Sequence, residues 1–119
     1  IAFLFSSNFM MAKRLEENMR AYYLALSGID ITISTLLSTV EIDSNGEEKS
    51  MVSIIEEDNV DREFNDEIEI EGDKVKINLK YDSNKKEFII KSSVELDNLK
   101  KNLTASISFY GNSYRVKWN

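Results

Sequence analysis

The chain has 119 residues and a net charge of −6, and its 42% hydrophobic and 30% charged residues are typical of one folded domain, 1–119. It has no Cys and no His. Their absence excludes a disulfide framework, thiol catalysis and cysteine-ligated zinc, and it removes the commonest general base. We therefore expect no enzymatic activity, no cofactor, no bound metal and no small-molecule substrate.

The chain opens on the apolar run IAFLF, which is too short to cross a bilayer, since a spanning helix needs about 20 apolar residues. From position 15 onward, apolar residues recur at alternating spacings of four and three, the pattern of one helical face. They are Leu15, Met19, Tyr22, Leu26, Ile29, Ile33, Leu36 and Val40. Extended backwards, the same series reaches Ala12, Asn8, Phe5 and Ile1, all apolar except Asn8, so the opening run is in register with it.

This pattern predicts an N-terminal helix over 1–40, with the β-branched stretch IDITI (29–33) as a local signal for a strand instead. The helix would be about 60 Å long at 1.5 Å per residue, which is more than one small domain covers. We expect its C-terminal half to dock on the rest of the fold and its apolar N-terminal end to protrude.

An acidic connecting region follows over 41–66. EIDSNGEEK (41–49) is rich in turn residues, MVSIIEE (51–57) is a possible strand, and 58–66 is predicted to be a loop. The loop from Asp43 to Glu47 faintly resembles a calcium-binding loop. Its Gly comes two residues too early and Ile54 stands where the bidentate Glu belongs, so a plain turn is the better interpretation.

The remainder, 67–119, predicts an antiparallel meander. A turn at Gly72-Asp73 pairs Glu69 with Lys76 and Ile70 with Val75, and a turn at Asn84-Lys85 pairs Tyr81 with Phe88. After a connection over 97–102, a turn at Gly111-Asn112 pairs three further positions: Phe109 with Tyr114, Ile107 with Val116, and Ala105 with Trp118. Each hairpin collects its apolar residues on one face, which the helix must cover. The predicted class is α+β, a long N-terminal helix packed on an antiparallel meander sheet.

Charge is distributed unevenly along the chain. Residues 41–73 contain fourteen acidic and two basic residues, whereas residues 74–119 contain ten basic and four acidic ones. The simpler interpretation is that acidic and basic strands lie side by side. The alternative is a dipolar surface through which subunits stack. Because neighbouring carboxylates would compensate much of the basic charge, we expect no nucleic-acid partner.

The segment FMMAKRLEENMRAYYLALSGIDITISTLL resembles the region after the membrane-spanning part of the helix in type IV minor pilins and pseudopilins. In that family a charged stretch precedes an A-Y-Y-x-A-x-S/A-G motif and an apolar helical run. The motif positions here are Ala21, Tyr22, Tyr23, Ala25, Ser27 and Gly28, followed by Leu36 and Leu37. The prepilin cleavage site and the acidic residue near the mature N-terminus are missing, as expected for a chain that begins inside the membrane helix. The C-terminal disulfide of many pilins is missing as well.

The resemblance implies a pilin-like fold and a structural role. We expect a subunit of a type IV pilus or pseudopilus, anchored in the membrane before assembly, then located in a cell-surface filament with a possible role in adhesion. Its partners would be other pilin subunits, bound through an assembly interface at Ile1, Phe5, Met11 and Leu15. The alternative is a membrane-tethered or coiled-coil binding module unrelated to pili, whose helix self-associates through the same stripe.

Overall fold

The computed structural model describes the backbone of residues 2–119 and the side chains of residues 12–119. Helix α1 (Ala2–Leu37) leads into a small hairpin of β1 (Thr39–Ile42) and β2 (Glu48–Ser50), and then into helix α2 (Met51–Asp58). Five strands follow: β3 (Arg62–Ile70), β4 (Asp73–Asp82), β5 (Glu87–Leu96), β6 (Leu99–Tyr110) and β7 (Ser113–Trp118). They form one antiparallel sheet in the order β3-β4-β5-β6-β7. The α+β class and the helix-on-sheet arrangement are as predicted.

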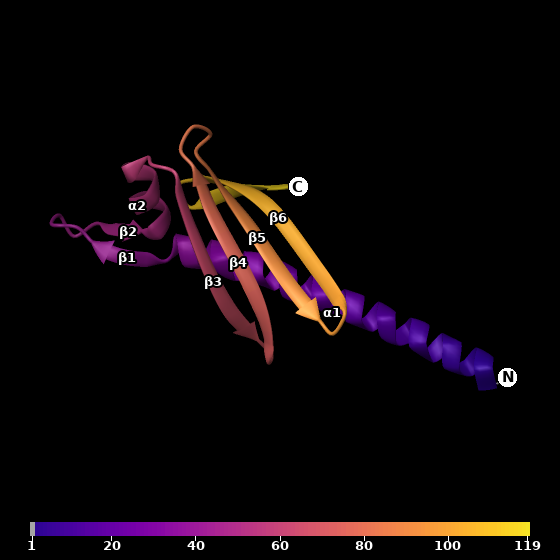
Figure 1. Cartoon of the computed structure of the whole chain (residues 1–119). Coiled ribbons are helices and arrows are strands. Elements are labelled where there is room, and N and C mark those ends of the chain that lie inside the picture. The colour runs from indigo at the N-terminus through magenta and orange to yellow at the C-terminus, as the bar shows by residue number, and fades with distance from the viewer. Residues whose placement is uncertain (1) are drawn as a thin grey trace.

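The molecule is elongated, 73 × 27 × 23 Å, because α1 continues past the end of the sheet (Figure 1). Its C-terminal half crosses one face of the sheet and packs on β4, β5 and β6. The hairpin of β1 and β2 lies at the opposite end of the molecule from the N-terminus. In this respect the prediction of a docked C-terminal half and a protruding N-terminal end is confirmed.

The core lies between α1 and the sheet. Its fully buried side chains come from all the elements in contact there and include Leu24, Ile29, Leu36, Ile55, Val75, Phe88, Ile90 and Ile107. The Phe88 ring packs at a tilt of 46° against its cross-strand neighbour Tyr81 and meets Phe109 edge-on, with ring centroids 4.8 Å and 5.4 Å apart respectively. Leu26, on the predicted stripe, and Leu37 are only partly buried.

Two predicted hairpins have the predicted register. Tyr81 pairs with Phe88, and across Gly111-Asn112 Phe109 pairs with Tyr114. Trp118 pairs with buried Ala105 and therefore shares the face of the sheet that α1 covers, as predicted. However, it remains 53% exposed because β7 is at the edge of the sheet.

The first hairpin turn was predicted one residue too late. The turn is Glu71-Gly72, so Ile68 pairs with Val75 and Glu69 with Lys74. Both turn residues have positive φ, 52° and 87°, which is the requirement of a type I′ turn with Gly second. The prediction placed Gly first. Because the error shifts the pairing by two residues, every side chain stays on its predicted face.

Four further segments differ from the predictions. The helix ends at Leu37, and Val40 lies in strand β1. Residues 51–57, predicted as a strand, form α2: the Ser50 side chain accepts a hydrogen bond from the backbone N–H of Ser53 and caps that helix. The sheet begins at Arg62, inside the predicted acidic loop, and the predicted connection over 97–102 is a tight turn followed by the start of β6.

Candidate assembly surface

Between residues 21 and 28, the face of α1 that packs on the sheet is made mostly of small residues. Ala21, Ala25 and Gly28 are buried against the sheet, with Leu24 between them. A Cβ atom added to Gly28 would lie 2.5 Å from Ser92 Oγ and 2.9 Å from Val75 Cγ1. The helix backbone therefore approaches β4 and β5 as closely as only glycine permits.

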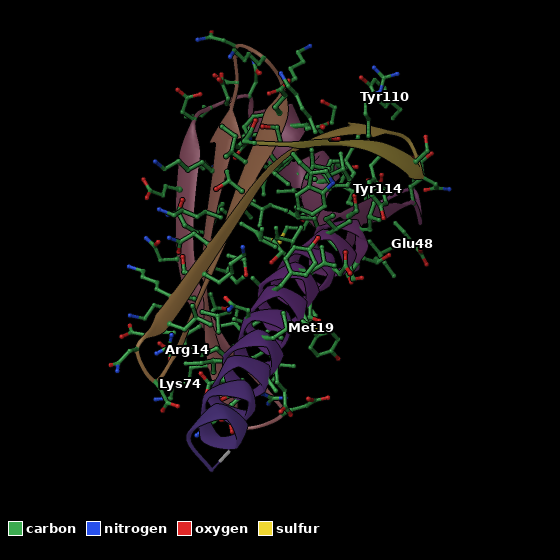
Figure 2. All side chains as sticks on the ribbon, turned by 90° about the vertical axis from the view of Figure 1, so that its right-hand side faces the viewer. Arg14, Met19, Glu48, Lys74, Tyr110 and Tyr114 are labelled. Atoms are coloured by element: carbon green, nitrogen blue, oxygen red, sulfur yellow. The ribbon has the colours of Figure 1, made fainter. Side chains whose placement is uncertain are left out.

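The outer face of α1 carries the first part of the predicted stripe. Leu15 is 62% exposed and Met19 65% exposed, and Tyr22 is about half exposed. Figure 2, which looks along α1 from its N-terminal end, shows Met19 on the side away from β3 and β4. The prediction did not foresee that Met19 and Tyr22 would be left uncovered.

The reason is geometric. Up to Gly28 the buried positions of α1 are Ala21, Leu24, Ala25 and Gly28, whereas the stripe positions Ile29, Ile33 and Leu36 are buried only further along the helix. The small residues at 21, 25 and 28 mark the docked face there instead. Their spacing of four and three was the available sequence signal.

Of the predicted interface residues, the structure describes the side chain of Leu15 alone. Ile1 and the side chains of Phe5 and Met11 lie outside the described residues. Positions 5 and 11 belong to α1, on its part that continues past the sheet. Leu15, Met19 and Tyr22 together are called the outer stripe below.

Two polar contacts tie α1 to the sheet near the outer stripe. The Arg20 guanidinium donates to Asp73 Oδ2 from Nε at 3.1 Å and from Nη2 at 2.5 Å, and Nη1 reaches Glu71 Oε2 at 3.4 Å. Hydrogen bonding to Asp73, opposed by desolvation, raises the pKa of Arg20. On the other side of the helix, Lys101 Nζ lies 5.9 Å from the centre of the Tyr22 ring.

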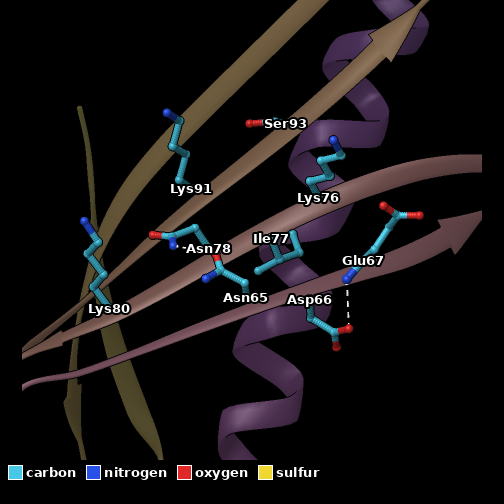
Figure 3. Close-up of a pocket in the computed structure, with 9 residues that line it drawn as sticks. All are labelled: Asn65, Asp66, Glu67, Lys76, Ile77, Asn78, Lys80, Lys91 and Ser93. Carbon is cyan, nitrogen blue, oxygen red and sulfur yellow. Dashed lines mark hydrogen bonds between the residues drawn. The ribbon is translucent and has the colours of Figure 1, made fainter.

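The opposite face of the sheet is polar. A shallow, open hollow of about 720 Å³ lies along β3, β4 and β5, and Lys76, Lys80, Lys91, Asn78 and Ser93 border it (Figure 3). Glu67 of β3 pairs with Lys76, and Glu63 with Lys80. Acidic and basic strands therefore do lie side by side, as the simpler interpretation of the charge pattern predicted. This is a solvated face on which acidic residues of β3 stand beside basic residues of β4, and Lys74 forms an ion pair with Glu67 at 3.6 Å.

The connecting region contains a turn whose backbone N–H groups are hydrogen-bonded by a side chain of the same turn. Asp43 Oδ1 accepts hydrogen bonds from the backbone N–H groups of Asn45 and Glu47, at 2.9 Å and 2.8 Å. This is the plain turn that was preferred to a calcium loop. Among the residues that the structure describes, no group of three or more acidic side chains is placed to hold a metal ion.

Comparison with protein-family models, with curated proteins and with solved structures gives no match for this chain. Within the described part of the chain, no helix has a stretch long and apolar enough to cross a membrane.

Proposed function

We propose that the chain is a structural subunit of a type IV pilus or a related filament, a pilin-like minor pilin or pseudopilin. One observation carries the proposal: α1 continues past the sheet, and beside this extension Leu15 and Met19 are more than 60% exposed. The described residues of the monomer leave this apolar surface exposed. Contact with helices of other subunits would bury it at about 25 cal/mol per Å².

The motif shared with minor pilins supports the same role. Its small residues Ala21, Ala25 and Gly28 seat the helix on the sheet, while Tyr22 and Tyr23 stay about half exposed. One helix thus has a face for its own domain and a face for neighbours. In this proposal the subunit is held in the membrane before assembly and is then packed into a cell-surface filament. Its mechanism is assembly, without catalysis, and its partners are other pilin subunits.

The test is Leu15→Glu. A carboxylate buried among packed helices without a partner costs far more than the lost apolar contact, whereas on the monomer surface it stays hydrated. We expect the melting temperature of the purified chain to change by no more than about 2 °C, because surface substitutions stay within about 0.5 kcal/mol. In the native host, with the complete gene, incorporation into filaments should fall sharply.

The matched control is Asn18→Asp, which adds the same charge to an exposed position one helical turn away and outside the outer stripe. It should leave incorporation unchanged. Normal incorporation of Leu15→Glu would refute the pilin proposal. If the purified chain also dimerised through α1 and Leu15→Glu abolished that dimer, the coiled-coil binding module would replace it.

A further inference from the structure

The five-stranded sheet has two edges. Within the described chain, β3 and β7 each pair on one side only, so each presents a row of backbone N–H and C=O groups to a possible partner strand. Strand directions alternate through the meander, so β3 and β7 run parallel to each other. A second copy placed beside the first in the same orientation therefore sets its β7 next to β3 as a parallel pair.

We propose that β7 of one copy pairs with β3 of the next, so that the sheet continues from subunit to subunit. This inference deepens the proposed function and rests on it for the existence of an array. Parallel pairing keeps every α1 projecting to the same side, as a common helical core requires. The contact is heterologous, so it propagates instead of closing into a dimer.

The side chains that point away from α1 match in charge. On β3 these include Glu67 and Glu69, which share the outward face with Lys76 and Lys74 of β4. On β7 they are Arg115 and Lys117. A register that sets Glu67 beside Arg115 also sets Glu69 beside Lys117, giving two opposite-charge pairs across the junction.

The side chains on the α1 side match in apolar character in the same register. Ile68 meets Val116 and Ile70 meets Trp118, whose 53% exposure in the monomer would then fall. Beside β3 lies an apolar hollow of about 250 Å³ that separates it from α1. Its lining includes Ile31, Thr35, Phe64, Asp66, Ile68 and Leu79. In the proposed pairing, the exposed rings of Tyr114 and Trp118 on β7 lie on the same side of the sheet as this hollow and pack against it.

Asp66 adds selectivity to the junction. It points to the α1 side of β3, opposite to Asn78 and Lys91 in Figure 3, and its Oδ1 accepts a hydrogen bond from the backbone N–H of Glu67. An inward carboxylate on an edge strand blocks pairing with a purely apolar strand. In the register above, Asp66 meets Tyr114, whose hydroxyl can donate to it. Strand β3 therefore disfavours pairing with purely apolar strands and favours pairing with β7.

The experiment uses the absence of Cys from the chain. Two single variants, Glu69→Cys and Lys117→Cys, are purified, mixed and oxidised. Within one copy β3 and β7 are four strand spacings apart, about 19 Å, whereas a disulfide needs Cα atoms within about 7 Å, so any bond joins two copies. We expect a mixed disulfide dimer from the mixture and monomers from each variant alone.

The matched control is Lys91→Cys, at an exposed outward position of the central strand β5. It should form no disulfide with either variant. Three results overturn the proposal: self-linked Glu69→Cys, equal linking to Lys91→Cys, or no mixed dimer from variants whose circular dichroism shows a native fold.

A second arm tests the charge pairs. The variant Arg115→Glu/Lys117→Glu, which also carries the β7 cysteine at Ser113→Cys, should lose at least tenfold in linking to a β3 partner with Asn65→Cys. A partner that also carries Glu67→Lys/Glu69→Lys should recover it, because both pairs are restored in the opposite sense. Loss without recovery overturns the register.

The two proposals fail separately. Leu15→Glu is predicted to block filament incorporation and to leave the mixed disulfide unchanged. Absence of the disulfide alongside assembly that depends on Leu15 overturns edge pairing alone. A strong disulfide alongside normal filaments from Leu15→Glu overturns the pilin proposal alone.

Discussion

Gly28 of α1 lies directly against Ser92 of β5, so closely that a Cβ atom at position 28 would come within 2.5 Å of Ser92 Oγ. Ser92 is completely buried, and its hydroxyl has no hydrogen-bond partner among the described residues. Close approach of helix and sheet is thus obtained at a point where a polar group is left unsatisfied. This contact gives the first prediction.

Gly28→Ala should lower the free energy of unfolding by about 1–3 kcal/mol, because overpacking outweighs the roughly 1 kcal/mol that Ala gains over Gly in a helix. Ser92→Ala should raise it by about 1 kcal/mol, because it removes an unsatisfied buried hydroxyl. Urea titrations of both variants and of the double variant give the coupling energy. Additive effects would mean that the two side chains do not meet.

The second prediction separates the two faces of α1. Ile33 is 5% exposed in the core, and Ile33→Ala should destabilise the chain by about 2–5 kcal/mol. Leu15→Ala, on the outer stripe, should change stability by less than about 0.5 kcal/mol. Equal losses in a denaturant titration would place Leu15 in the core and remove it from any assembly surface.

The third prediction concerns pH. Burial raises the pKa of Glu56 in α2, an effect that nearby Lys86 partly offsets. At a pH above both the folded and the unfolded pKa, the folded state therefore contains a carboxylate whose partial burial is unfavourable. This penalty decreases as the pH falls through the folded pKa and is gone below the unfolded pKa of about 4.3. Glu56→Gln should raise the melting temperature at pH 7, and the gain should vanish near pH 4.

The control for this pH effect is Glu57→Gln, in the same helix. Glu57 forms an ion pair with Lys49 at 3.3 Å with most of its side chain exposed, so its removal should give no gain at either pH. A gain at pH 7 from both variants would point to the net charge of the chain as the cause.

The fourth prediction compares two hairpin turns. Asp97 and Gly111 have φ values of 51° and 65° at the first position of the turns after β5 and β6. A residue with a side chain is strained there by about 1–2 kcal/mol. Asp97→Gly should therefore stabilise the chain by up to about 1 kcal/mol, and Gly111→Ala should destabilise it by a similar amount, both measured by thermal unfolding. The same sign for both changes would contradict this account.

Much of the fold was predictable because it depends on local pairing. The turn at Gly111-Asn112 left one register in which Ile107 meets Val116 and the apolar residues share a face. The strand predicted at 51–57 was wrong because the prediction gave more weight to the β-branched residues of this segment than to the Ser50 cap and the helical spacing of Val52 and Ile55. In a segment this short, the N-cap is enough to favour a helix over a strand when the helix also buries Val52 and Ile55.

The candidate surface was only partly predictable. The four-and-three pattern places Leu15 and Ile33 on one stripe, but which part of that stripe the sheet covers depends on where α1 crosses the sheet and on the close approach at Gly28. Both are tertiary effects. The match between the β3 and β7 edges was likewise hidden, because it appears only when the strand order is known.

The long separation between Gly28 and Ser92 along the chain also sets an order of events during synthesis. The helix leaves the ribosome before the strands on which it packs, β4 to β6, have been made. Throughout that interval the small-residue face of α1 has nothing to lie against, while each hairpin of the meander closes on its immediate neighbour. The sheet therefore assembles first, and docking of α1 completes the fold. A nascent chain arrested before β6 should accordingly expose α1 to proteases while β3 and β4 are already paired.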